Sequence, residues 1–332
     1  MPIRSLARRV GTMLRASLAL ASRAEASHDV GRAIVMHERW QKERLSRIEK
    51  EQRRISHLLE KVILDQSDQA KHARRMESDV AALLRRDALP PNRLPFPQSL
   101  LSQRFRGLSQ NDEDGITLAL FDLIGHGSRR FAEIGAGTNG GNSGFLAREC
   151  GWTGLMIDAS PERVKRLQRN FGPYGVKAVA EMVSRENVNQ LLESNGLTGD
   201  IDLLSVDIDG NDYWVWQALT VASPRVVVVE YNAAWGAQQA VVVPYDATFD
   251  RHQHGGPLKY YGASLAAFKC LAAEKGFRFL MTEPRGVNAY FVRNDVELPV
   301  DSRAHQSMPS DEKEPPLLRL VRERGLPLVH LD

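Results

Sequence analysis

Short apolar runs alternate with amphipathic stretches through the middle of the chain. The runs FAEIG, GLMID, VKAVAEMV, IDLLSVDID and RVVVVEYN are typical of strands, and helical segments separate them. After a further helical stretch, SLAAFKCLAAEKG, the segments FRFLMT and VNAYFVR indicate two more strands. Strands that alternate with helices form βαβ units, whose parallel sheet is covered by helices on both faces. The pattern predicts a doubly wound α/β domain over residues 101–293.

The helix that follows GLMID has a clear beginning in the sequence. Ser160 is a suitable N-cap and Pro161 a suitable first helical residue. Val164, Leu167 and Phe171 recur on one side of this segment. We therefore expect a helix that begins at Pro161 and packs this apolar stripe on the sheet.

A narrow apolar seam runs along the chain from Leu45 to Leu83. Steps of alternately three and four residues reach twelve positions, of which nine are apolar, and no Gly or Pro interrupts them. A seam of this kind favours a coiled coil over a helix packed on a globular core. We predict a coiled-coil helix over residues 31–87 that joins two chains as a homodimer. The alternative is a helix that folds back on the α/β domain.

Three further segments lie outside the α/β pattern. The first 24 residues hold five arginines and no acid, so residues 1–30 could form a basic amphipathic helix on an anionic membrane; a solvated helix start is the alternative. Residues 88–100 contain four prolines, which predict an extended linker. The tail, residues 294–332, is Pro-rich and charged apart from LLRLVRERG.

Composition limits the class of protein. The chain of 332 residues has a net charge of only +3, which requires no polyanionic partner such as a nucleic acid. Its two cysteines are too few for a disulfide framework and suggest a reducing compartment. No apolar run approaches the roughly 20 residues of a membrane-spanning helix. We expect a cytoplasmic protein, with peripheral membrane contact through the N-terminus as an open alternative.

The stretch FAEIGAGTNGG contains the candidate nucleotide site. Gly135, Gly137 and Gly140 satisfy the G-x-G-x-x-G pattern of dinucleotide-binding turns. Such a turn brings a pyrophosphate to a helix N-terminus, where Glu133, just upstream, would repel it. An NAD-dependent oxidoreductase or epimerase is therefore the less favoured interpretation.

S-adenosylmethionine suits this arrangement better, because it has no phosphate and carries a sulfonium and an ammonium group. Glu133 would attract these cations, and Asp158, at the end of the next strand, could accept both ribose hydroxyls. The alternatives are a solvated strand end for Glu133 and a helix-capping role for Asp158. A third interpretation is a non-catalytic nucleotide-binding scaffold whose working part is the coiled coil.

The motifs resemble those of a known group. EIGAG, GLMID and LLSVDIDGNDYWVWQAL are similar to the motifs of class I S-adenosylmethionine-dependent methyltransferases, and VDIDGND resembles the D-V-E-G-x-E stretch of FkbM-type members. The resemblance covers residues 110–293. It implies a seven-stranded sheet with a terminal antiparallel hairpin, and O-methylation of a glycan, a lipid-linked sugar or a small metabolite. The residues expected to bind the cofactor are Glu133, Gly135, Gly137, Asn139, Asp158, Ala159 and Asp207.

Methyl transfer to a hydroxyl usually needs a base as well as alignment. The candidates are Asp207, Asp209 and Glu230 at strand ends, and His252 in the RHQHGG loop. We assign no metal, although Asp207 and Asp209 with a further oxygen ligand from Asn211 or Asp212 could hold Mg²⁺.

Aromatic residues occur at two further places. Tyr213, Trp214 and Trp216 are expected in the core rather than in a pocket. Tyr260 and Tyr261 lie in a long loop that we expect to shape the acceptor pocket.

Overall fold

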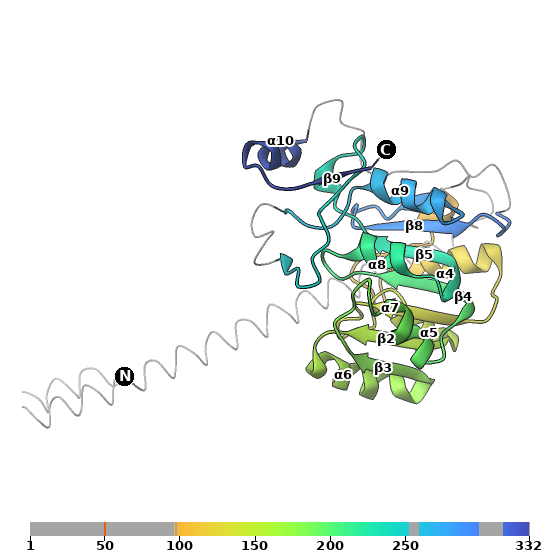
Figure 1. Cartoon of the computed structure of the whole chain (residues 1–332). Helices are drawn as coiled ribbons and strands as arrows, with labels where there is room; N and C mark the ends of the chain where they lie inside the picture. The colour runs from red at the N-terminus through yellow and green to blue at the C-terminus, as the bar shows by residue number, and fades with distance from the viewer. Residues whose placement is uncertain (1–49, 51–95, 97, 252–258, 299–314, 332) are drawn as a thin grey trace, which may run out of the picture. The chain divides into compact units, whose positions relative to one another are not determined.

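The computed structural model describes residue 50, residue 96 and residues 98–251, 259–298 and 315–331. Within them a seven-stranded sheet forms the centre, with strand order β3-β2-β1-β4-β5-β8-β7 (Figure 1). The predictions for residues 1–30, for the coiled coil and for His252 concern residues outside the described ranges, apart from residue 50.

The strands alternate with helices as the apolar pattern predicts. The strands are β1 (Arg130–Ile134), β2 (Thr153–Asp158), β3 (Val176–Ala180), β4 (Gly199–Val206), β5 (Ala222–Glu230), β7 (Phe277–Thr282) and β8 (Asn288–Arg293). The helices are α3 (Gln98–Leu101), α4 (Glu113–Ile124), α5 (Gly144–Cys150), α6 (Pro161–Phe171), α7 (Val188–Ser194), α8 (Asp212–Ala218), α9 (Leu265–Glu274) and α10 (Pro316–Glu323). None of the helices in the described ranges is both long and apolar enough to cross a membrane.

Strand β8, which is antiparallel to its neighbours, defines the topology of the sheet. Strands β1 to β5 pair in parallel, whereas β8 pairs antiparallel with both β5 and β7. Strand β7 therefore runs in the same direction as β1 to β5. FRFLMT and VNAYFVR supply the antiparallel hairpin that the resemblance implies, and this expectation is confirmed.

Helices cover both faces of the sheet. Phe131 of β1 lies in one buried cluster together with Leu120 of α4 and Leu167 of α6. Ile134, on the opposite face, lies in a second cluster with Trp216 of α8. Because side chains alternate along a strand, these two layers are separate apolar cores of one domain.

Two local predictions are confirmed. Helix α6 begins at Pro161, and the Ser160 hydroxyl accepts a hydrogen bond from the Arg163 amide. Tyr213 and Trp216 are almost fully buried, as expected of core aromatics. Trp214 is only partly buried and donates its indole N–H to the Val243 carbonyl.

The domain extends beyond the predicted limits of 101 and 293. Leu100, in the segment expected to be a linker, is buried in the core beside α4. Residues 315–331 of the tail pack on the segment between β5 and α9: Leu317 of α10 shares a small apolar cluster with Trp235, and β9 (Val329–His330) pairs with β6 (Val241–Val242). The apolar half of LLRLVRERG therefore covers this inserted segment.

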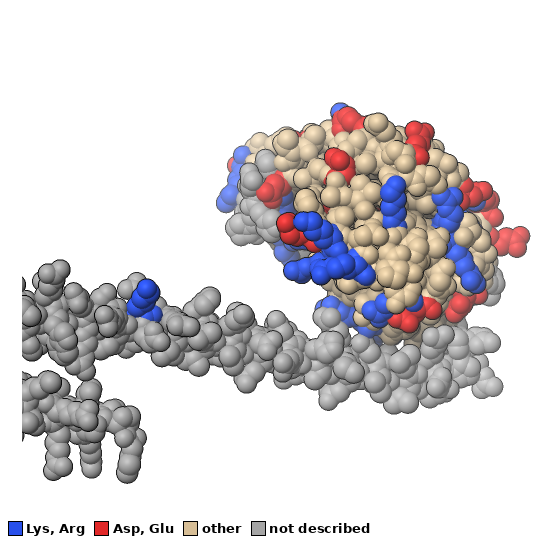
Figure 2. All heavy atoms as spheres, turned by 90° about the horizontal axis from the view of Figure 1, so that it is seen from below, with Lys and Arg blue, Asp and Glu red and all other residues tan. Residues whose placement is uncertain are grey.

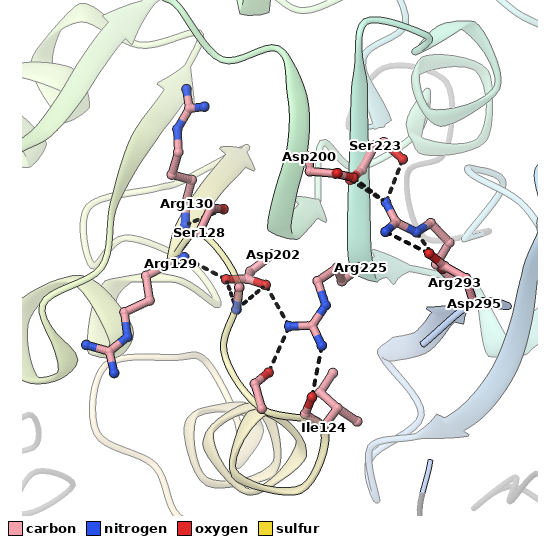
Figure 3. Close-up of polar contacts among 12 residues, drawn as sticks. Ile124, Ser128, Arg129, Arg130, Asp200, Asp202, Ser223, Arg225, Arg293 and Asp295 are labelled. Atoms are coloured by element: carbon pink, nitrogen blue, oxygen red, sulfur yellow. Dashed lines mark hydrogen bonds and ion pairs between the residues drawn. The ribbon is translucent and has the colours of Figure 1, made fainter. Parts of the chain in front are cut away.

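A buried ion pair holds the amino ends of β4 and β5. The carboxylate of Asp202 is fully buried and accepts hydrogen bonds from the amides of Gly127 and Arg129 and from the guanidinium of Arg225 (Figure 3). Arg225 also donates to the Ile124 carbonyl at the end of α4. This group fixes the turn that leads from α4 into β1.

The charged side chains at the surface carry both signs. Figure 2 shows Lys and Arg interspersed with Asp and Glu over one face of the molecule, in keeping with a net charge of +3. This face offers a mixed surface of both signs.

Candidate functional site

The carboxyl ends of the strands bring polar side chains into one row. Glu133 of β1 pairs in register with Ser205 of β4, Val206 pairs with Val229 of β5, and Glu230 pairs with Asn288 of β8. This register sets Asp207, Glu230 and Asn288 next to one another. In open α/β sheets, ligands bind at this edge.

Glu133 lies beneath the Gly-rich turn. Its carboxylate is fully buried and accepts hydrogen bonds from the Asn142 amide at 3.1 Å, the Ser143 hydroxyl at 2.5 Å and the Ser205 hydroxyl at 2.8 Å. Burial raises the pKa of Glu133 to about 7. A Cβ added at Gly141 would lie 2.0 Å from its Oε1 atom, which is why that position needs a glycine.

This position bears on the predicted role of Glu133, whose contact with a cofactor stays a prediction. The side chain has no exposed surface through which to contact a sulfonium group. Its carboxylate oxygens already accept hydrogen bonds from three groups of the protein. The arrangement assigns Glu133 a different task, which is to hold the start of α5 and the glycine turn against β4.

Asp158 ties the same turn to β2. Its two carboxylate oxygens accept hydrogen bonds from the amides of Gly137 and Ser160, each at 2.9 Å. The guanidinium of Arg163 lies 3.5 Å away. Ser160, rather than Asp158, caps α6. A carboxylate has about four acceptor positions, so two remain for the hydroxyls of a ribose.

The glycines of the turn serve two different purposes. At Gly135, with φ of +90°, an added Cβ would lie 1.7 Å from the carbonyl oxygen of Asp207, so the backbone that follows β4 itself requires a glycine. At Gly137, with φ of +61°, an added Cβ would meet only the Asn139 side chain, at 3.2 Å. The turn is thus packed against protein at Gly135 and open at Gly137.

The two other residues predicted to bind the cofactor differ in their contacts. Asn139 donates its amide to the Leu108 carbonyl at 2.5 Å and so joins the turn to the segment before α4. Ala159 is exposed beside Asp158. Ala159 is therefore accessible beside Asp158, whereas the side chain of Asn139 is engaged with the segment before α4.

Three carboxylates meet where β4, β5 and α8 converge. Oxygen atoms of Asp207, Asp212 and Glu230 lie within 4.8 Å of one another. Burial raises the pKa of Asp207 to about 6 and that of Asp212 to about 7. Burial, together with the neighbouring Asp207, raises the pKa of Glu230 well above its ordinary value. The closeness of these acids to one another thus adds to the effect of burial.

The turn after β4 explains how Asp212 reaches this cluster. Asp209 has a φ of +59°, an unusual conformation for a residue other than glycine, and the chain reverses there. Asp212, the first residue of α8, then accepts hydrogen bonds from the amides of Ile208 and Gly210. Asp212 is part of the VDIDGND motif, but its position beside Asp207 and Glu230 depends on the change of chain direction at Asp209.

Arg251 is the cation beside these acids in the described part of the chain. Its guanidinium forms an ion pair with Asp209 and lies 4.0 Å from Glu230. It also stacks over the ring of Tyr261 at 4.7 Å. Asp209, the third strand-end candidate for a base, is exposed and paired with this arginine. Tyr261 therefore borders the acidic edge, whereas Tyr260 donates its hydroxyl to the Pro327 carbonyl of the tail.

Buried groups from α4 and β8 complete the edge. Glu113 is fully buried and accepts hydrogen bonds from the side-chain amides of Asn111 and Asn288. Asp114 accepts three backbone amides from residues 107–109 through one oxygen. Sequence reasoning did not find Glu113 or Asn288, because neither lies in a recognisable motif.

Comparisons with known proteins give structural matches only. No protein-family model matches the sequence, and no curated protein matches it. A solved O-methyltransferase family protein from Burkholderia thailandensis is 11% identical, with 56% of this chain and 58% of that chain covered and a TM-score of 0.35. The methyltransferase domain of bacterial CtHen1-C is 14% identical, with coverage of 55% and 97% and a TM-score of 0.35.

A third match is TnmH, at 16% identity and a TM-score of 0.32, with 51% of this chain covered. The match spans only 50% of the length of TnmH. At these values the matches do not establish a family. The function is therefore inferred from the topology of the sheet and from the residues of the site.

Proposed function

We propose that the chain is an S-adenosylmethionine-dependent methyltransferase that acts on an acceptor hydroxyl, and that it forms a divergent member of the FkbM type. The sheet order carries this proposal. An antiparallel β8 inserted between β5 and β7 gives the seven-stranded sheet that the resemblance implies. The dinucleotide-binding fold instead has six strands in the order 3-2-1-4-5-6.

The acidic edge of the sheet supports a cationic donor. Asp207, Asp209, Asp212 and Glu230 lie close together, and among the described cations Arg251 pairs with Asp209 and lies 4.0 Å from Glu230. Such a field attracts the positive charge of a sulfonium and opposes a diphosphate. The negative charge that faces the donor therefore comes from the ends of β4 and β5, because Glu133 is buried beneath the turn.

Each part of the site has a distinct proposed task. When bound, S-adenosylmethionine supplies a methyl carbon that its sulfonium activates. Asp158 holds the ribose hydroxyls, and the open turn at Gly137 accommodates the nucleoside. Asp207 and Glu230 face the acceptor hydroxyl. Its oxygen forms the new bond to carbon, the carbon–sulfur electron pair stays on sulfur, and its proton passes through a carboxylate at this edge to solvent.

The acceptor belongs to the classes that the resemblance implies, namely a glycan, a lipid-linked sugar or a small metabolite. We also propose that residues 31–87 join two chains as a dimer, that residues 1–30 offer peripheral membrane contact and that the protein is cytoplasmic. Sedimentation of the full chain and of a chain that begins at Leu101 tests the dimer. A dimer of the shorter chain would contradict this role of residues 31–87.

The replacement Asp158→Ala tests the nucleoside site. Calorimetric titration of the full chain with S-adenosylhomocysteine should show binding that Asp158→Ala weakens by at least about 30-fold, or about 2 kcal/mol, because two hydrogen bonds to a carboxylate are lost. Asp200→Ala, an exposed acid at the opposite edge, is the matched control. Equal affinity of wild type and Asp158→Ala would refute the assignment.

A further inference from the structure

The cluster of Asp207, Asp212 and Glu230 contains buried oxygens that lack a donor. Glu230 is 8% exposed, and no donor in the described part of the chain hydrogen-bonds its Oε2 atom. Asn288 is 2% exposed and lies opposite Glu230 on the neighbouring strand. Its Oδ1 atom also lacks a partner among the described residues, while its Nδ2 group donates to Glu113. Buried acceptors without donors are costly unless a ligand satisfies them.

The spacing of the carboxylates fits one ion. Two oxygens on opposite sides of an ion are separated by about twice the metal–oxygen distance, roughly 4.2 Å for Mg²⁺ and 4.8 Å for Ca²⁺. One oxygen from each of Asp207, Asp212 and Glu230 lies within 4.8 Å of the other two. Carboxylate and carboxamide oxygens are ligands that these hard cations prefer.

The three side chains are also held in place. The two amide hydrogen bonds of Asp212 fix its carboxylate at the start of α8 and leave further lone pairs on both oxygens. Asp207 directly follows β4 and Glu230 is the last residue of β5, and the pairing of Val206 with Val229 sets the register of these parallel strands. A cation here would therefore bind groups from three different elements without rearrangement of the backbone.

We propose that Asp207, Asp212 and Glu230 bind one divalent cation of the Mg²⁺, Mn²⁺ or Ca²⁺ class, with the Asn288 amide oxygen beside it. The role of the ion rests on the proposed function: it binds the acceptor hydroxyl and lowers the pKa of that hydroxyl, so that its proton leaves more readily. The ion undergoes no change of oxidation state in this role. The acceptor is then a molecule whose hydroxyl can enter the coordination of the ion.

Titration of the full chain with Mn²⁺, followed by electron paramagnetic resonance and calorimetry, tests this site. We expect one ion per chain, displaced by Mg²⁺ or Ca²⁺. Glu230→Gln and Asp207→Asn, which keep the shape of the side chains, should each weaken Mn²⁺ binding by at least ~10-fold. Asp200→Asn, at the amino edge of the sheet, should leave the affinity unchanged. Circular dichroism of each variant checks that it is folded.

The replacement Arg251→Gln should change the affinity for Mn²⁺ in the opposite direction. Removal of a positive charge 4.0 Å from Glu230 should strengthen Mn²⁺ binding by ~3-fold or more. The absence of saturable binding, equal weakening by Asp200→Asn, or unchanged or weaker binding by Arg251→Gln would overturn the proposal. S-adenosylhomocysteine is titrated in parallel. Its binding without Mn²⁺ binding would refute only the cation site, and Mn²⁺ binding alone would refute only the methyl donor.

Discussion

Replacement of Glu133 by Gln should change how the stability of the protein depends on pH. The carboxyl group is fully buried, and burial raises its pKa from 4.5 to about 7. In the unfolded chain the group loses its proton at lower pH than in the folded chain. The folded state therefore binds more protons between these two values, and the free energy of unfolding falls as pH rises through this window.

The size of the effect follows from the two pKa values. At about 1.36 kcal/mol for each pH unit, the window from 4.5 to about 7 corresponds to a loss of about 3 kcal/mol. The amide that replaces the carboxyl group would not titrate, although it would keep a carbonyl oxygen for the Asn142 amide. The free energy of unfolding of Glu133→Gln minus that of wild type should therefore rise by about 3 kcal/mol between pH 4.5 and pH 7.

Urea unfolding of both proteins at half-unit pH intervals measures this difference directly. Because both proteins share every other titrating group, the comparison isolates Glu133. Glu193→Gln, on the exposed face of α7, serves as the matched control. A difference that is constant with pH, or that falls as pH rises, would refute the argument that Glu133 is a desolvated acid beneath the turn.

Two further predictions concern the turn and the opposite edge of the sheet. Gly135→Ala should unfold or severely destabilise the domain, because its Cβ would lie 1.7 Å from the Asp207 carbonyl oxygen. Gly137→Ala should cost only about 1–2 kcal/mol of stability and weaken the binding of S-adenosylhomocysteine. Thermal unfolding measures the first effect and calorimetry the second, and equal losses of stability in the two variants would contradict the assignment. Asp202→Ala should destabilise the fold by about 3–5 kcal/mol, because it leaves the Arg225 guanidinium and two amides without their acceptor. The folded fraction should keep its affinity for the ligand. A loss of stability below about 1 kcal/mol in urea unfolding would contradict this prediction.

The sequence predicted those features that local patterns determine. Strand β7 covers the same residues as FRFLMT, β2 ends at Asp158 as expected, and Ser160 caps α6. Each of these depends on neighbours in the sequence, namely apolar periodicity, a strand end or a capping hydroxyl. The hairpin of β7 and β8 was expected from the resemblance, because an apolar run alone does not give strand direction.

Features that depend on distant contacts could not be predicted. The burial of Glu133 requires Ser205 from β4 and the return of the chain at Gly141. The meeting of Asp212 with Glu230 requires the reversal at Asp209. A carboxylate at a strand end has the same appearance in a sequence whether it faces a ligand or the underside of a turn, and only the packing distinguishes the two.

The most direct test of the central claim is a pair of calorimetric titrations of the full chain, one with S-adenosylhomocysteine and one with NAD. The open turn at Gly137, the Asp158 carboxylate and the acidic strand ends predict one bound S-adenosylhomocysteine per chain and no binding of NAD. Tight binding of NAD, with no heat from S-adenosylhomocysteine, would contradict the proposed methyltransferase.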